Sequence, residues 1–392
     1  MLVLVANIGS TSYKYRLFDT EGEAVLAEGK AECVRRPGGS PDYDNAILAS
    51  VAEIVGPNKP LASLSQLGGV GFKAVHAGPI TGAQIVDDKV LGAMEEFSFF
   101  APAHNPPYIA AIRAFQRELP DVPLVAVFET SFFENLSEAA MTYALPGAWK
   151  EQHGIRRYGF HGASHRAASE RVRDHFGRSD LRHISCHLGG SSSVAAIKNG
   201  VGVDSSFGIS PQSGLPQTHR VGDIDVFAIL FMMKKLNLGV DEMASMLGSQ
   251  SGLAGISGLS GDVRDLEAAT QNGDPRARLA LDVFVRAVRH YIGAFFVELG
   301  GLDVLTFSGG IGENSSRIRS AICHGLSIIG IEIGEEWNRC VSRRGTISTN
   351  ASPVKVLVLP ADEEIIVARA TAALVSASQG LRQTEPATRE AK

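Results

Sequence analysis

The sequence is poor in cysteine and has no long apolar run, and both shortages exclude classes of protein. Its four cysteines, Cys33, Cys186, Cys323 and Cys340, are far apart and form no CxxC pair. This spacing disfavours a zinc knuckle or a disulfide framework and favours reduced thiols. No run reaches the roughly 18 apolar residues of a membrane span, and no basic segment precedes the first apolar run. We therefore expect a cytoplasmic protein without a membrane partner.

The chain also lacks a large excess of charge of either sign. Its 37 Lys and Arg residues and 42 Asp and Glu residues give a net charge of -5. This balance gives no electrostatic reason to expect nucleic acid as a partner. A chain of 392 residues, of which 44% are hydrophobic, can bury a large core and is long enough for two domains.

Short apolar runs rich in β-branched residues alternate with segments of helical spacing. Strand-like runs occur at residues 2–6, 69–75, 123–128, 182–186, 193–198, 304–307 and 355–359. Helical patterns occur at residues 108–118, 225–236, 279–299 and 363–377. The alternation predicts an α/β fold, and the long pattern at 279–299 predicts a core or interface helix.

Three of the strand-like runs end in loops of small residues. The loops read NIGSTS, HLGGSSS and SGGIGENS. Glycine lets the backbone approach an anion closely, because it tolerates positive φ and has no side chain. One such loop is compatible with an ordinary surface turn, whereas three favour a nucleotide site. The chain contains neither GxxxxGK[ST] nor GxGxxG, which disfavours P-loop and Rossmann proteins.

These loops belong to a larger set of segments that resembles the acetate kinase family. The segments are NIGSTSYKYRLFD, AHNPP, VAVFETSFF, RYGFHGASH, SCHLGGSSSVAAIKNG, THRVGDID, SGLAGISGLSGDVRD, SGGIGEN and LPADEEIIVAR, in family order over about residues 2–375. The resemblance implies two ribonuclease-H-like α/β domains of the sugar kinase, heat-shock chaperone and actin superfamily around a central cleft. Residues 1–132 plus 365–392 are expected to form the acid-side domain, and residues 133–364 the nucleotide-binding domain.

The resemblance also implies a reaction and its participants. ATP and a short-chain carboxylic acid exchange a phosphoryl group with the help of Mg²⁺ or Mn²⁺, which gives an acyl phosphate and ADP. The family further implies a homodimer.

By the same resemblance, functional residues of the family fall on positions of this chain. Phosphoryl transfer needs cations and donors where charge collects, and magnesium prefers hard oxygen ligands. The residues implied for phosphoryl transfer are Arg220, His161, Glu129 and Lys73, and those for magnesium are Asn7 and Glu363. The implied ATP-binding residues are Ser10, Ser12, Lys14, His187, Gly189, Gly190, Asp262, Arg264, Gly310, Ile311 and Asn314. The implied acid-binding residues are Val75, Ala103, His104 and Pro211.

Several positions depart from the family pattern around the transferred group. Lys73 stands where the family has an arginine, and its ammonium group lacks the bidentate geometry of a guanidinium. Glu129 stands where the family has an aspartate, so its carboxylate reaches one methylene further. CHLGGS replaces CHLGNG, so Gly190 stands where an asparagine is expected, and SGLPQTHR replaces EGLMMGTR before Arg220.

Ala103 changes the expected size of the acid pocket. The family has a leucine there, and the change to alanine removes roughly three carbons of side chain. We therefore expect an acid larger than acetate. Gln217, His219 or Lys73 are candidates to bind a polar substituent on that acid.

Three functional classes stay open at this point. The first is a carboxylate kinase, which predicts acid-dependent release of ADP. The second is a regulatory ATP-binding relative in which the changes at Lys73, Glu129 and Gly190 have removed catalysis. The third is an acyl-phosphate hydrolase, in which water replaces the carboxylate and inorganic phosphate is released.

Overall fold

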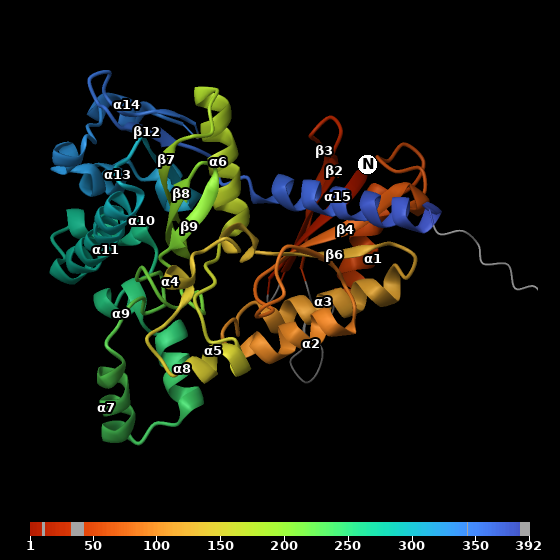
Figure 1. Cartoon of the computed structure of the whole chain (residues 1–392), viewed down its shortest axis with the longest axis horizontal. Coiled ribbons are helices and arrows are strands. Elements are labelled where there is room, and N and C mark those ends of the chain that lie inside the picture. Colours follow the sequence, from red (N-terminus) through yellow and green to blue (C-terminus); the bar gives the residue numbers. More distant parts are fainter. Residues whose placement is uncertain (10–11, 33–42, 343, 385–392) are drawn as a thin grey trace, which may run out of the picture. The chain divides into compact units, whose positions relative to one another are not determined.

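The computed structural model describes residues 1–9, 12–32, 43–342 and 344–384, which belong to two compact units (Figure 1). Unit 1 consists of residues 1–131 together with the chain from residue 362 onwards, and unit 2 consists of residues 132–361. Each unit has its own sheet and its own hydrophobic core. The chain therefore leaves unit 1 after residue 131 and returns to it for the last helix.

The sheet of unit 1 has the strand order β3-β2-β1-β4-β6-β5. Its parallel strands are β1 (Leu2–Ile8), β4 (Leu67–Ala74) and β6 (Leu124–Phe128). Its antiparallel strands are β2 (Ser12–Asp19), β3 (Ala24–Glu32) and β5 (Ala83–Ile85). The carboxyl ends of β1, β4 and β6 consequently meet at one edge of the sheet, which is where open α/β sheets usually bind ligands.

Helices cover both faces of this sheet because successive strand residues point to opposite faces. Leu4 and Ala6 of β1 share a core with α1 (Tyr43–Ile54), α2 (Asp88–Glu96) and α3 (Asn105–Glu118). Val3 and Val5 pack instead against α15 (Glu363–Thr384). Gly71 of β4 lets α15 lie close, since a Cβ there would be 2.3 Å from the hydroxyl of Thr371.

The sheet of unit 2 has the strand order β11-β12-β10-β7-β8-β9. Its parallel strands are β7 (Arg182–Leu188), β10 (Val304–Ser308) and β12 (Lys355–Val358). Its antiparallel strands are β8 (Ser192–Lys198), β9 (Val201–Ser205) and β11 (Gly345–Thr346). The run β9-β8-β7-β10-β12 repeats the order and directions of β3-β2-β1-β4-β6. This repeat is the topology expected of two ribonuclease-H-like units, and the predicted α/β class is confirmed.

α11 (Pro275–Leu299) is the central core helix of unit 2, as its apolar spacing predicts. The carboxylate of Asp274 caps its first turn, and Gly300, with φ 70°, ends it. α11 shares the core with α9 (Gly252–Ser257) and α10 (Val263–Gln271), whereas α6 (Gly162–Phe176) packs against β10.

The other helices of unit 2 are short. They are α4 (Glu138–Met141), α5 (Gly147–His153), α7 (Val226–Leu236), α8 (Val240–Ser249), α12 (Gly309–Asn314), α13 (Ser316–Cys323) and α14 (Glu335–Cys340). Within the described ranges, no helix combines the length and apolar character needed to cross a membrane. Cys186 and Cys323 are buried free thiols and Cys340 is an exposed one, whereas Cys33 lies outside the described residues.

Candidate active site

Polar side chains gather at the carboxyl ends of the parallel strands of unit 1. Asn7 is the penultimate residue of β1, Lys73 is that of β4, and Glu129 directly follows β6. The backbone N–H of Glu129 donates to the carbonyl of Ala74 at 2.8 Å, which joins the ends of β4 and β6. α15 adds Glu363, whose carboxylate accepts a hydrogen bond from Lys73 Nζ and forms an ion pair with it.

Lys73 is a positive charge in this cluster. Its side chain is 21% exposed and that of Glu363 is 13% exposed, while Glu129 is buried. Burial lowers the pKa of Lys73, but the carboxylates of Glu363 and Glu129 outweigh burial and raise the pKa above its ordinary value. The structure therefore brings together three residues implied for phosphoryl transfer and magnesium, and gives Lys73 the role of their counter-charge.

Tyr108 of α3 belongs to the same cluster, although sequence reasoning missed it. Its hydroxyl accepts a hydrogen bond from the N–H of Ile8 at 3.3 Å and donates to Asn7 Oδ1 at 3.3 Å. Because only the amide oxygen can accept, this bond fixes the direction of the Asn7 amide. Burial raises the pKa of Tyr108 to about 12 despite the opposing charge of Lys73, so the phenol keeps its proton. The sequence feature that could have identified Tyr108 is its position in the first turn of the helix that starts within AHNPP.

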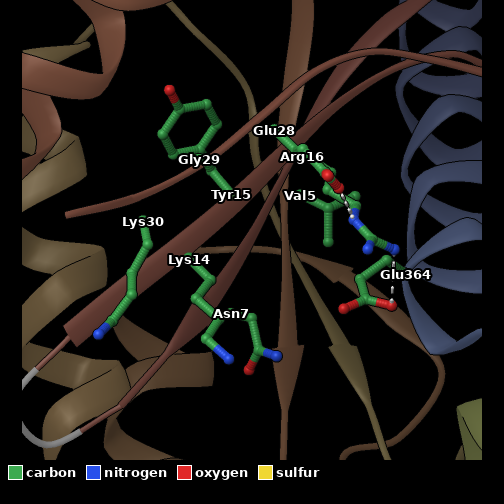
Figure 2. A pocket seen from close by; sticks show the side chains of 9 residues that line it. All are labelled: Val5, Asn7, Lys14, Tyr15, Arg16, Glu28, Gly29, Lys30 and Glu364. Atoms are coloured by element: carbon green, nitrogen blue, oxygen red, sulfur yellow. Dashed lines mark hydrogen bonds and ion pairs between the residues drawn. The ribbon is translucent and has the colours of Figure 1, made fainter.

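A cavity of about 430 Å³ lies beside Asn7 (Figure 2). Asn7, Lys14 and Lys30 stand opposite one another on β1, β2 and β3, and all three line the cavity. An ion pair at 3.8 Å between Arg16 and Glu364 forms another part of its wall. Two ammonium groups beside an amide suit an anion such as a phosphate group.

The loop between β1 and β2 was expected to bind phosphate through Ser10 and Ser12. Ser12 begins β2, and its carbonyl accepts a hydrogen bond from the N–H of Gly9 at 2.7 Å. Ser10 lies outside the described residues.

The residues implied for the acid pocket fall in both units. In unit 1, Val75 is buried directly after β4, Ala103 is exposed, and His104 immediately precedes α3. The side-chain amide of the buried Asn105 donates a hydrogen bond to the backbone carbonyl of His76 at 2.7 Å. This bond joins the start of α3 to the segment that follows β4. Pro211 belongs to unit 2.

In unit 2, His161 and His187 face each other with ring centroids 4.3 Å apart. His161 precedes α6 in a left-handed conformation, with φ 59°, and its Nδ1 lies 2.8 Å from Ser193 Oγ. His187 is near the carboxyl end of β7, and its Nδ1 lies 2.7 Å from Ser164 Oγ. In each histidine, a hydrogen bond between Nδ1 and a serine hydroxyl therefore fixes the orientation of the imidazole ring.

His165 is hydrogen-bonded to the same hydroxyl group as His161, that of Ser193. His165 Nε2 is 2.9 Å from Ser193 Oγ, and its Nδ1 is 2.9 Å from Ser185 Oγ. Burial, reinforced by His187, lowers the pKa of His165 well below its ordinary value, so this ring is neutral. Because the single proton of the Ser193 hydroxyl can serve only one ring at a time, the tautomers of His161 and His165 are linked.

The loops that follow β7 and β10 lie side by side, because these strands are parallel neighbours. A Cβ at Gly189 would lie 3.7 Å from the backbone nitrogen of Gly310. Gly309 has φ 76°, and a Cβ there would come within 2.6 Å of the carbonyl of Leu188, so this position requires glycine. The structure thus groups several of the implied ATP-binding residues, namely His187, Gly189, Gly190, Gly310, Ile311 and Asn314.

Asp262 and Arg264 pair with each other at the start of α10. Asp262 accepts a hydrogen bond from the backbone N–H of Arg264 at 2.8 Å, and the two side chains form an ion pair at 2.6 Å. The hydrogen bonds from Arg264 lower the pKa of Asp262. These contacts stabilise the helix start, and the implied role of the pair near the ribose stays a prediction.

Arg220 contacts both the loop after β7 and the segment that contains Pro211. Its NH1 donates to Ser191 Oγ at 3.2 Å, to Gln217 Oε1 at 3.3 Å and to the carbonyl of Pro211 at 3.4 Å. Burial lowers the pKa of Arg220, but a guanidinium remains charged at neutral pH. The structure therefore brings together Arg220, Pro211 and the loop of Gly189 and Gly190.

The sequence profile of the acetokinase family matches residues 2–369 of this chain. The chain belongs to this family. The acetate kinases of Alkaliphilus metalliredigens and Treponema denticola are 38% and 40% identical to it, over 96% of this chain and 100% of each relative. The crystal structure of Porphyromonas gingivalis acetate kinase has a TM-score of 0.85 at 34% identity, over 95% of this chain and 99% of that one. A propionate kinase from Francisella tularensis has a TM-score of 0.86 at 29% identity, over 94% and 98% of the two chains.

The resemblance seen in the sequence motifs is thereby confirmed over nearly the whole chain. As a member of the acetokinase family, the protein is an ATP-dependent phosphotransferase whose acceptor is a carboxyl group. The solved acetate and propionate kinases also confirm the predicted two-domain fold class.

One sequence expectation for this acetokinase changes. Gln217 was a candidate to bind a polar substituent on the acid, but its side chain is buried and 1% exposed. Its Oε1 accepts a hydrogen bond from Ser191 Oγ at 2.7 Å, and its Nε2 donates to the carbonyl of Pro211 at 2.8 Å. Protein groups thus occupy both ends of this amide, and Gln217 is no longer a candidate for that contact.

Proposed function

We propose that this acetokinase transfers the γ-phosphoryl group of ATP to a short-chain carboxylic acid, giving an acyl phosphate and ADP in a reversible reaction. The observation that carries the proposal is the cluster of Lys73, Glu129 and Glu363 at the strand ends of unit 1. Relatives named acetate kinase and propionate kinase support the same reaction class. In this proposal most of the acid-binding residues belong to unit 1 and most of the nucleotide-binding residues belong to unit 2.

We propose magnesium, or manganese in its place, as the metal of this site, held by Glu129 and Glu363 with the help of Asn7. Among residues 1–9, 12–32, 43–342 and 344–384, no group of three or more His, Cys, Asp and Glu side chains could hold a metal by itself. Magnesium usually takes one or two carboxylates, keeps several waters and shares phosphate oxygens, and Glu129 and Glu363 supply two carboxylates in this proposal. When bound, the ion supplies positive charge beside the phosphates.

The other residues act through position and charge. Phosphoryl transfer requires an in-line arrangement and donors where negative charge collects. We assign the planar guanidinium of Arg220 and the ring of His161 to the transferring group, and Lys14 and His187 to the phosphates of ATP. The contacts of His161, His187 and Arg220 with neighbouring hydroxyl groups support their assignment, because these contacts limit the motion of each group before the reaction. Lys14 is assigned because it lines the cavity beside Asn7.

The acid is proposed to be larger than acetate. Ala103 is exposed and short, and Val75 is buried directly after β4. If both residues line the acid pocket, as the family resemblance implies, alanine gives that pocket a smaller wall residue than the leucine of the family pattern. An added methylene in a fitting apolar pocket changes kcat/KM by about 10- to 200-fold.

A panel of acids from formate to four carbons, assayed for ADP release with ATP and Mg²⁺, tests both points. We expect propionate or butyrate to give a kcat/KM at least about tenfold above that of acetate, with acyl phosphate trapped by hydroxylamine. Equal or better turnover of acetate would contradict the proposed pocket size. ATP binding without acid-dependent turnover would favour the regulatory alternative, and release of inorganic phosphate from acyl phosphate would favour the hydrolase.

We also propose a homodimer that uses α7. This helix has no buried residue and exposes Val226, Phe227, Leu230 and Phe231, which are 60%, 75%, 53% and 62% exposed. A contiguous apolar surface of this kind usually marks a protein interface. α11, the other candidate, buries eight residues within its own unit and therefore has less apolar surface available.

The pair of substitutions Phe227→Glu and Phe231→Glu is expected to convert the dimer to a monomer, because it places charge within the apolar surface. Sedimentation velocity measures the change in mass. Ile328→Glu, at a residue that is 89% exposed, is the matched control and should leave the mass unchanged. Dissociation by Val297→Glu on α11, with no effect of the α7 substitutions, would assign the contact to α11 instead.

A cytoplasmic location is part of the same proposal. The buried free thiols of Cys186 and Cys323 support a reducing compartment.

A further inference from the structure

The side-chain amide of Gln217 contacts three different segments of unit 2. Its Oε1 accepts hydrogen bonds from Ser191 Oγ at 2.7 Å and from Arg220 NH1 at 3.3 Å. Its Nε2 donates to the carbonyl of Pro211 at 2.8 Å. The residue is 1% exposed, so water cannot replace these bonds.

The backbone holds Gln217 firmly in this position. Its N–H donates to the carbonyl of Arg220 at 3.0 Å, and its own carbonyl accepts from the N–H of Leu253 at 2.8 Å. Gly252, with φ 64°, permits this close approach, because a Cβ there would lie 2.1 Å from the carbonyl oxygen of Gln217. The amide is therefore fixed by its own main chain before any ligand arrives.

Two polar side chains meet Arg220 at this point. Ser191 supplies a hydroxyl and Gln217 an amide. A glycine at 191 would have no hydroxyl to donate, and a methionine at 217 would have only a weak acceptor and no donor. The hydrogen bonds between Ser191, Gln217 and Arg220 thus depend on these two side chains.

We propose that Gln217, together with Ser191, is a positioning residue that holds Arg220 and couples it to the acid-binding segment at Pro211. Within the described part of the chain, the hydrogen bonds of the Arg220 side chain all leave from NH1. The Nε and NH2 edge is left for two parallel bonds to a phosphoryl group, which is the geometry that makes guanidinium selective for phosphate. This proposal rests on the proposed function, since it assigns Arg220 to the transferring group.

The substitution Gln217→Met tests the proposal with little change in side-chain volume. We expect kcat to fall about 10- to 100-fold, because small displacements of a positioning group have effects of this size, while the KM for ATP stays within about twofold. Ser191→Gly should lower kcat in the same direction, and the double variant should resemble Gln217→Met, because both changes remove one connected set of bonds. Gln212→Met is the matched control, since Gln212 lies in the same loop with its amide against Gly248, and its kcat should equal that of the unchanged protein.

A second measurement does not depend on activity. Modification of Arg220 by an arginine-selective dicarbonyl reagent, followed by peptide mass spectrometry, should be several-fold faster in Gln217→Met than in Gln212→Met. Equal modification rates together with unchanged kinetics in Gln217→Met would overturn the positioning role. If the unchanged protein phosphorylates no carboxylic acid, the proposed function fails, and the modification rates still decide whether Gln217 holds Arg220.

Discussion

Replacing Lys73 with methionine is expected to lower kcat by at least about 100-fold and the free energy of unfolding by about 3–5 kcal/mol. The ammonium of Lys73 pairs with Glu363 and lies in the field of Glu129, and both carboxylates are largely or fully buried. Without it, the two like charges stay in a poorly hydrated site with no compensation from this residue. Steady-state kinetics and urea unfolding measure the two effects.

Lys73→Arg is the matched control, because it keeps the positive charge. We expect it to unfold within about 1 kcal/mol of the unchanged protein, since both cations can pair with Glu363. Magnesium should raise the melting temperature of Lys73→Met more than that of Lys73→Arg, because the cation then supplies the missing charge. A methionine variant as stable and as active as the unchanged protein would contradict the counter-charge role of Lys73.

Replacing Arg319 with methionine is expected to destabilise unit 2 on the order of 3 kcal/mol and to raise the KM for ATP severalfold. Arg319 is 1% exposed, and its guanidinium donates to the side chain and carbonyl of Asn338 and to the carbonyls of Gly312 and Glu313. The last two carbonyls belong to α12, which carries residues implied for ATP binding. Urea unfolding and ATP titration of the rate measure the two changes.

Arg317→Met provides the comparison for this second prediction. Arg317 lies on the same helix, α13, but is exposed, so its loss should change stability by less than about 0.5 kcal/mol. If Arg317→Met and Arg319→Met destabilise the protein equally, the effect belongs to the helix surface and not to the bonds that hold α12.

Local sequence pattern predicted where helices form better than it predicted where they begin or whether the folded chain buries them. The helical pattern at 279–299 is part of α11, but the helix begins at Pro275, because a polar first turn capped by Asp274 carries no apolar signal. The pattern at 225–236 is also a helix, yet α7 buries none of its residues. Periodicity identifies an apolar face, but it does not reveal whether the same chain covers that face.

In the candidate site, too, sequence motifs identified some residues and only the structure identified others. Motifs led to Lys73, Glu129 and Glu363, and the structure places them together. Tyr108 escaped notice because its role comes from a contact with Asn7, which lies 101 positions away in sequence. Gln217 was identified from the sequence, but for a contact with the acid that its burial excludes. No spacing rule links Tyr108 to Asn7, so only the folded chain shows that these two residues share a site.

The return of the chain to unit 1 has a consequence for synthesis on the ribosome. When residue 131 has emerged, the strand face formed by Val3, Val5, Val125 and Val127 still lacks α15, which follows the whole of unit 2. All residues of unit 2 are synthesised before those of α15. Unit 1 is completed only when α15 covers that face and brings Glu363 into contact with Lys73. A chain that terminates early therefore exposes an apolar surface to chaperones and proteases and never assembles the cluster, so the chemistry is confined to finished molecules.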